Sequence, residues 1–340
     1  RRLDLQLAAR YQDRDQAGSP TVAKCGVTWA PVDSLLFRAS YSEGFRAPAL
    51  TEYQVAGSVS TSTLTDPRRT PATTTGIQTF RGSNPNIKPE TSSTEFFGLV
   101  FEPKQHAKGL LFQLNYYRTI QHDIIQSISG QTIVNNETAF PGRVTRAPQT
   151  PTDLSLNQPG QITAVDITLI NFGDVINHSL DFVAEYRLPS ETFGRWVFGF
   201  NGSRTLKSIR EVRPGLPAID DEGDTFSPPK WKLTSSVFWT KGPWNGSLFV
   251  SYLSSFKTNM SGNTFTTTYP IDAQMRVDLR GGYEFKNGVW RGYGKGFRVM
   301  AGIGNVLDEE PAFADTVFGF NGALHSPMGR TYETSVIIPF

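Results

Sequence analysis

The chain has 340 residues, of which 38% are hydrophobic, and its mean hydropathy is −0.31. No stretch approaches the roughly 18 consecutive apolar residues that a membrane-spanning helix needs, so a helical membrane protein is excluded. The formal net charge is only +2 and basic residues are scattered, so no nucleic-acid partner is indicated. The single cysteine, Cys25, excludes an internal disulfide and a cysteine-based zinc site.

Alternation of apolar and polar residues predicts β-strands along the whole chain, and helical periodicity is almost absent. The stretch 163–173 is weak and belongs either to a long loop or to the strand that follows, which leaves twelve strands. The candidate strands are 3–12, 21–30, 34–43, 93–102, 110–126, 163–173, 177–188, 194–206, 229–240, 244–256, 273–286, 297–306 and 330–340.

Charged residues keep to one parity of each strand, and parity decides which face of a sheet a side chain occupies. The charged set, expected to face a lumen, comprises Arg276, Asp278, Arg280, Asp181, Glu185 and Arg187. The apolar set, expected to face outward, comprises Val277, Leu279, Tyr283, Phe285, Leu180, Phe182, Tyr186, Val336 and Ile338. A lysine or arginine facing lipid costs about 2–4 kcal/mol at mid-membrane, which would produce this separation. A soluble β-sandwich would show the same alternation.

The lengths of the connections separate these two fold classes. Short connections are predicted at 31–33, 102–109, 189–193, 241–243 and 286–296. Long ones alternate with them at 44–92, 127–176, 207–228, 257–272 and 307–329. Short turns at one end and long loops at the other are typical of outer-membrane barrels, with the long loops extracellular, whereas a sandwich has no reason to sort its loops.

The final strand supports the barrel as well. Residues 332–340 alternate and end on Phe340, as bacterial outer-membrane barrels do. Closing a barrel also removes the sheet edge that such a strand would otherwise leave open. The alternative interpretation of this tail is an ordinary edge strand in a soluble domain.

Three sequence motifs resemble one family, the TonB-dependent outer-membrane receptors. Residues 36–52 read LFRASYSEGFRAPALTE and are similar to the family's strand followed by Gly-Phe-Arg-Ala-Pro. Residues 84–98 read NPNIKPETSSTEFFG and resemble its Asn-Pro-x-Leu-Lys-Pro-Glu motif. Asn305 to Asp308, followed by Gly329 and Arg330, resemble its Asn-Leu-x-Asp and Gly-Arg motifs near the end of the barrel. The residue types favour a role in building the barrel first and in ligand binding second.

The resemblance implies an all-β, antiparallel transmembrane β-barrel, here partial: about twelve C-terminal strands of a barrel of about 22, with residues 1–340 as the C-terminal portion. A plug domain, absent here, would precede residue 1 and engage the TonB–ExbB–ExbD complex. The expected function is active uptake of a scarce ligand across the bacterial outer membrane, a ferric siderophore first, with haem, cobalamin or a carbohydrate as alternatives. Further partners would be lipid, lipopolysaccharide and the outer-membrane assembly machinery, which would read the end at Phe340. Neither catalysis nor a cofactor is implied.

Two other function classes stay open: a passive pore or barrel enzyme, and a soluble all-β binding module. An enzyme would need a positioned nucleophile and base. No Gly-x-Ser-x-Gly motif accompanies the four histidines, which we expect to be solvated rather than catalytic or metal-binding. They are His106, His122, His178 and His325.

The long loops contain the candidate ligand-binding residues. The Ser-, Thr- and Pro-rich stretch 58–76 includes Arg68 and Arg69, and Arg81 follows it. Arginine suits carboxylate, catecholate or phosphate-bearing ligands because its guanidinium donates in a fixed fork. The plainer interpretation is a solvated loop whose arginines contact solvent or lipopolysaccharide. The acidic run Asp220–Asp224 could bind a divalent cation, but its spacing matches no known calcium loop.

Overall fold

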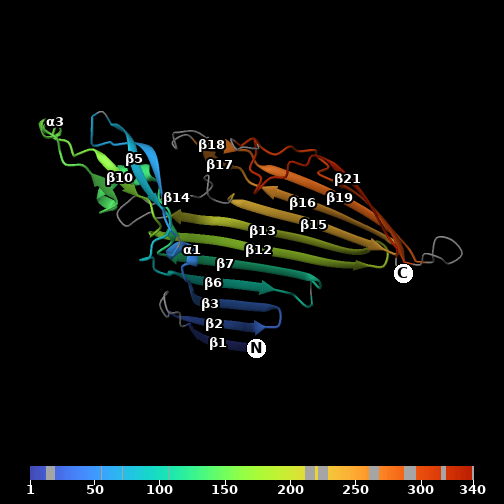
Figure 1. The fold of residues 1–340 in the computed structure, drawn as a ribbon. Coiled ribbons are helices and arrows are strands. Elements are labelled where there is room, and N and C mark those ends of the chain that lie inside the picture. The colour runs from blue at the N-terminus through green and yellow to red at the C-terminus, as the bar shows by residue number, and fades with distance from the viewer. Residues whose placement is uncertain are drawn as a thin grey trace.

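The computed structural model describes residues 1–12, 20–54, 56–70, 72–105, 107–210, 219–220, 229–259, 268–286, 296–314 and 319–338. Twelve long strands follow one another in chain order across a single large sheet, and every neighbouring pair is antiparallel. Figure 1 shows this sheet as a curved wall. The predicted all-β class and the count of twelve strands are confirmed.

The strands of the wall have these bounds: β1 Arg2–Tyr11, β2 Thr21–Val32, β3 Leu35–Arg46, β6 Glu90–Phe101, β7 Leu110–His122, β12 Asp174–Ser190, β13 Gly194–Arg210, β15 Trp231–Lys241, β16 Trp244–Leu253, β19 Gln274–Phe285, β20 Phe297–Gly304 and β21 Thr331–Ile337. Most strands have ten or more residues, which suits a crossing of the membrane at the tilt of a barrel strand.

Shorter elements lie in the connections at one end of the wall. The strands among them are β4 Ser58–Thr65, β5 Thr73–Arg81, β8 Ile125–Gln126, β9 Val144–Arg146, β10 Ile162–Asp166, β11 Ile170–Asn171, β14 Ile219–Asp220, β17 Phe256–Asn259 and β18 Thr268–Ile271. The helices are α1 Leu50–Tyr53, α2 Gly130–Asn135, η1 Glu137–Ala139 and α3 Pro151–Ser155. No helix within the described ranges could span a membrane.

Two sequence-based assignments change in this region. The weak strand at 163–173 is not part of the wall; its first part is β10, which belongs to a separate sheet built from two long connections. The stretch 58–76, expected to be a solvated loop, contains β4 and the beginning of β5. The stretch is rich in threonine, and β-branched threonine favours a strand when a partner strand is present.

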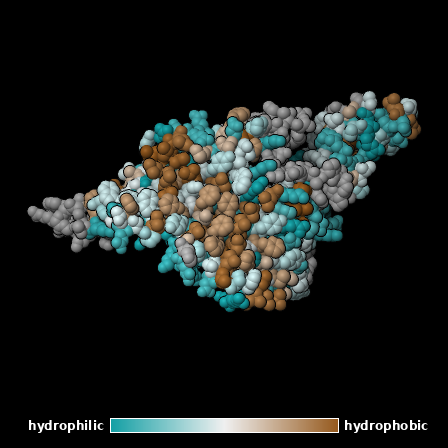
Figure 2. Space-filling view, turned by 180° about the vertical axis from the view of Figure 1, so that it is seen from behind, coloured by the Kyte–Doolittle hydropathy of each residue, from teal (hydrophilic) through white to brown (hydrophobic). Residues whose placement is uncertain are grey.

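The pairing of the strands places apolar and polar side chains on opposite faces of the sheet, as the alternation of charged and apolar residues predicted. Trp29, Phe37, Leu99, Leu114 and Phe182 are successive cross-strand partners, so they form an apolar row on one face. The row beside it on the other face is polar and consists of Thr28, Arg38, Gly98, Asn115 and Asp181. Figure 2 shows hydrophobic residues gathered across the sheet. In a barrel the apolar face is the one that meets lipid.

Aromatic residues line the short-turn end of the apolar face. The Trp196 and Trp239 ring centroids are 6.0 Å apart, and those of Trp244 and Tyr283 are 4.7 Å apart. Indole and phenol rings have an apolar body and a polar tip, so they favour the boundary between hydrocarbon and water. This row marks one edge of the membrane-facing band.

A charge placed on the apolar face should prevent stable insertion. Leu248 lies in the middle of β16 opposite Leu279, so we expect Leu248→Arg to destabilise the barrel by about 2–4 kcal/mol. Ser236→Arg, on the polar face of the neighbouring strand β15, is the matched control. Heat-modifiable gel mobility and the amount in the outer membrane of the full-length parent would measure this. Equal loss for both variants would contradict the assignment of the faces.

Candidate functional site

The two longest connections fold together into one unit, here called the loop domain and comprising residues 50–89 and 123–173. Its sheet has the order β4-β5-β10-β9, and the β5–β10 pair is parallel while the other pairs are antiparallel. Because β5 and β10 come from different connections, this pairing joins loops that are far apart in sequence. Figure 1 places the loop domain beyond one end of the wall.

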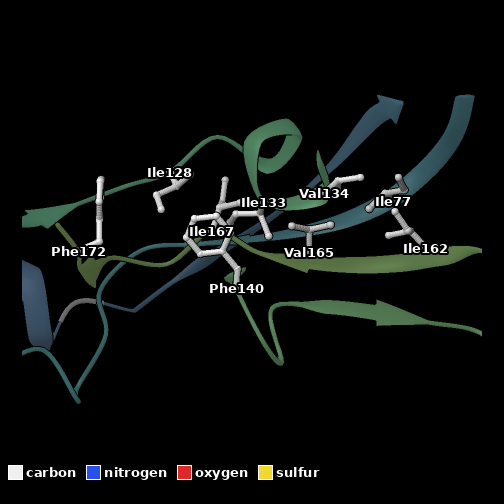
Figure 3. Close-up of a cluster of buried hydrophobic side chains, with 9 residues drawn as sticks. All are labelled: Ile77, Ile128, Ile133, Val134, Phe140, Ile162, Val165, Ile167 and Phe172. Carbon is white, nitrogen blue, oxygen red and sulfur yellow. The ribbon is translucent and has the colours of Figure 1, made fainter. Parts of the chain in front are cut away.

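The loop domain has its own hydrophobic core, which Figure 3 shows. Helix α2 contributes Ile133 and Val134, and Phe140 follows it with only 1% of its surface exposed. Ser129 caps this helix by accepting a hydrogen bond from the Thr132 amide at 3.1 Å. The whole core consists of Ile77, Ile128, Ile133, Val134, Phe140, Ile162, Val165, Ile167 and Phe172. A packed core gives these loops a defined shape before any ligand arrives.

A buried charge network holds the sheet edge to the helices. Arg146 in β9 donates to Asp66 at 2.6 Å and to Glu137 at 2.8 Å, and Arg68 reaches Glu137 at 2.9 Å. Asp66 has no exposed surface. Burial acts to raise the pKa of Asp66, but hydrogen bonds from Arg146 and from the Arg68 backbone prevail and lower it. Hydrogen bonding from Arg146 likewise lowers the pKa of Glu137.

A second carboxylate organises α3. Asp153 accepts hydrogen bonds from the Thr150 amide and hydroxyl at 2.9 and 2.8 Å, and from Gln158 at 3.1 Å. Arg69 pairs with it at 2.8 Å and also donates to the Pro159 carbonyl. These hydrogen bonds, the Thr150 amide first, lower the pKa of Asp153 well below its usual range.

The loop domain should therefore lose stability in acid. Asp66, Glu137 and Asp153 have lowered pKa values when folded, so their stabilisation is complete above the unfolded values of about 4 and disappears as the pH falls below them. We expect hydrogen exchange in β9 and β10 to accelerate below about pH 4 and to respond little between about pH 7 and 5. Wall strands are the internal control, and acceleration already near neutral pH would contradict this carboxylate mechanism.

The first two family-like motifs meet in a clamp at the mouth of the wall. Arg46, at the end of β3, makes two hydrogen bonds to Glu90 at 2.6 and 2.8 Å and also contacts Glu52 at 2.9 Å. Glu90 also accepts a hydrogen bond from the Ile125 amide at 2.7 Å. Asn171 accepts the Lys88 amide at 2.7 Å. These contacts confirm that the motifs serve to build the structure.

The third motif closes the connection before β21. Asn305, with a positive φ of 52°, exchanges hydrogen bonds with the backbone of Glu309. Asp308 accepts the Arg330 amide at 2.7 Å. A side chain at Gly329 would place its Cβ only 3.0 Å from the Asp308 carboxylate, so a glycine suits this close approach. The pattern of residues 305–308 and 329–330 thus ties the two ends of a long loop together.

A hollow of about 460 Å³, with both apolar and polar lining residues, opens between the end of β5 and the start of α2. Arg81 is exposed there, and Thr51, Ser83, Ser127 and Ser129 add hydroxyl groups. The remaining lining residues are Gly82, Ile128, Gly130, Ile167 and Leu169. One guanidinium among hydroxyls and a few apolar side chains suits a ligand with anionic oxygens and an apolar body.

The three candidate arginines have different surroundings. Arg81 lines the hollow, whereas Arg68 pairs with Glu137 and Arg69 pairs with the buried Asp153. Arg68 keeps 51% of its side chain exposed, but Arg69 keeps only 15%. The hydroxyl residues of the hollow were not singled out from the sequence, because serine-rich loops give no signal of where they converge.

One of the described histidines is less solvated than expected. His325 is only 4% exposed, stacks on Phe256, and has no hydrogen-bond partner on either ring nitrogen, which corrects the expectation of a solvated loop residue. His122 lies 2.9 Å from Asp174, and His178 contacts the Tyr116 hydroxyl at 3.2 Å. His106, Asp221–Asp224 and Phe340 lie outside the described residues. No group of three potential metal ligands occurs in the described part of the chain.

An antiparallel sheet with one apolar face, aromatic residues at its edge and loops gathered at one end is the wall of a transmembrane β-barrel. The model of the TonB-dependent receptor-like β-barrel family matches residues 1–306. The chain therefore belongs to the TonB-dependent receptor family, as its motifs indicated.

Solved structures agree on the fold. The ferric enterobactin receptor PfeA of Pseudomonas aeruginosa, as a double mutant, aligns with 98% of this chain at 17% identity and a TM-score of 0.64. The siderophore receptor PirA of Acinetobacter baumannii aligns with 98% at 13% identity and 0.67. The FrpB iron transporter of Neisseria meningitidis aligns with 98% at 12% identity and 0.57. The chain spans 42–43% of the length of these three proteins. No curated protein sequence matches it.

Proposed function

We propose that residues 1–340 are the C-terminal barrel portion of a receptor that imports a scarce ligand, a ferric siderophore first, across the bacterial outer membrane. The observation that carries this proposal is the loop domain: a unit with its own hydrophobic core at one end of the wall, with a hollow that Arg81 lines. Binding residues concentrate on loops held by a rigid scaffold. The names of the solved relatives, which are siderophore receptors and an iron transporter, support the choice of ligand.

Energy coupling would come from parts of the parent protein outside these residues. A plug region would engage the TonB–ExbB–ExbD complex, and this chain would supply the wall and the capture surface. Lipid and lipopolysaccharide would surround the apolar face. The outer-membrane assembly machinery would read the C-terminal end at Phe340, which we place on the lipid-facing parity. Chemistry on the ligand is not part of this proposal, because a receptor of this kind needs only to bind and release.

Arg81 is the residue to test first, and Arg68 and Arg69 follow. We expect Arg81→Ala to lower uptake of the ligand about tenfold or more, because a lost hydrogen bond to a charged group costs about 1.5–3 kcal/mol. The assay is uptake of a labelled ferric siderophore by cells that express the full-length parent at equal outer-membrane levels. Arg187→Ala, near the short-turn end of β12, is the control.

A triple change at Arg68, Arg69 and Arg81 would mix binding with folding, because Arg69 holds the buried Asp153. Single variants separate the two effects. Arg68→Ala should alter uptake less than Arg81→Ala does, since the Arg68 side chain is already paired. Wild-type uptake by Arg81→Ala for every ligand that the parent imports would remove this residue from the site.

A further inference from the structure

Charged and polar side chains lie on the apolar face of the wall near its loop end. Glu95, Arg118, His178 and Lys207 are successive cross-strand partners from β6 to β13, so they share that face. Arg204 lies on the same face, opposite Leu180. Charges are costly on the lipid-facing surface of a barrel except near the interfaces. We call Arg118, His178, Arg204 and Lys207 the outer-rim cluster.

The height of the outer-rim cluster can be estimated along β15. Trp231 is the first residue of β15, and Trp239 lies near the other end of that strand. The two tryptophans occupy the same face and are eight residues apart. At about 3.4 Å per residue this is about 27 Å along the strand, or about 21 Å across the membrane at a tilt of about 40°, close to an apolar band of about 25 Å. Arg204 is the partner of Trp231, and Lys207 lies further toward the loops. The cluster therefore stands at the level of lipid head groups.

The positive charge of the cluster is only partly balanced. Arg118 pairs with Glu95 at 2.9 Å. Arg204 lies over the Trp231 ring at 4.9 Å, and no ion pair among the described residues includes Arg204 or Lys207. Both side chains are exposed.

A β-bulge in β13 brings Lys207 onto the face of the other outer-rim residues. In β13, Leu206 has no cross-strand partner in β12, because Thr205 pairs with Ser179 and Lys207 with His178. This bulge shifts the parity of the strand and turns Lys207 onto the same face as Arg204. The His178 ring contacts the Tyr116 hydroxyl and lies within electrostatic range of Arg118 and Lys207. Just below lies an apolar surface that includes Phe182.

We propose that the outer-rim cluster binds the phosphate groups of lipopolysaccharide in the outer leaflet. Guanidinium and ammonium groups donate to phosphate, and the aromatic and aliphatic face below would meet the acyl chains. A head group with two or more phosphates matches cations that are spread over neighbouring strands. This inference rests on the proposed outer-membrane location and adds a defined lipid site to it.

The test uses the full-length parent, purified in detergent and titrated with lipopolysaccharide. We expect Arg204→Gln combined with Lys207→Gln to weaken binding about 30-fold, or about 2 kcal/mol, because each cation near a lipid surface contributes about a fivefold factor. Lys232→Gln is the control, since Lys232 lies at the same height on the opposite face. The Lys207→Gln single variant keeps the test valid if the double variant assembles poorly.

Dephosphorylated lipopolysaccharide and inorganic phosphate identify the recognised group. Wild-type protein should bind the phosphorylated lipid in a salt-sensitive way and the dephosphorylated lipid far less. Equal binding of the two lipids, equal binding by wild type and the double variant, or competition by inorganic phosphate at low concentration would overturn the lipid site. Ligand uptake measured in the same variants separates the two proposals, because the cluster lies outside the Arg81 hollow and its loss should leave uptake intact.

Discussion

Replacing Arg146 by alanine should unfold the loop domain while leaving the wall assembled. Its guanidinium is the main partner of Asp66, which is fully buried, and it also holds Glu137. Removing one member of a buried ion pair leaves an uncompensated charge and costs about 3–5 kcal/mol. Hydrogen–deuterium exchange of peptides covering β5 and β9 in the full-length parent would measure the loss.

The control for this change is Arg68→Ala, which removes a pair that is half exposed. An exposed ion pair contributes about 0–1 kcal/mol, so exchange should change little. Heat-modifiable mobility should be normal in both variants, because Arg146 makes its hydrogen bonds to Asp66, Glu137 and the Gly160 carbonyl, which lie outside the wall strands. Wild-type protection of the loop domain in Arg146→Ala would show that the network does not stabilise it.

Truncating Phe140 to alanine should have a comparable effect by a different mechanism. The ring is 1% exposed within the core of the loop domain, and removing such a ring costs about 3–5 kcal/mol from lost burial and the cavity left behind. Leu154→Ala is the control, because Leu154 on α3 belongs to the same domain but is 63% exposed. Faster exchange around β10, together with weaker ligand uptake, is the expected result.

The outcome of Phe140→Ala also tests whether capture needs a preformed surface. The Arg81 hollow shares Ile128 and Ile167 with the core, so loosening the core should distort the hollow. Loss of protection without any change in uptake would separate the loop domain from ligand capture. Unchanged protection would contradict the core itself.

The sequence predicted the wall because its signals are local. In β12 and β19 the apolar and charged residues keep opposite parities, and the twelve long strands follow one another in chain order. Each strand therefore pairs with the next, and short and long connections alternate. The family motifs gave a second, independent indication. Alternation alone could not distinguish a barrel from a sandwich.

The loop domain could not be predicted because its contacts are distant in sequence. The partner of β5 is β10, from the next long connection, and Asp66 meets Arg146 only after both loops fold. The burial of His325 depends in the same way on Phe256 in another connection. Lys207 of the outer-rim cluster could not be placed from the sequence, because the bulge at Leu206 changes the parity of β13.

The most direct measurement is uptake of a labelled ferric siderophore by cells that express the full-length parent, with and without a functional TonB complex. The function proposed above predicts uptake that requires both the parent and TonB, and that falls in the Arg81→Ala variant but not in Arg187→Ala. Uptake that continues unchanged without TonB, or no uptake of any iron-carrying ligand by correctly inserted parent, would contradict it.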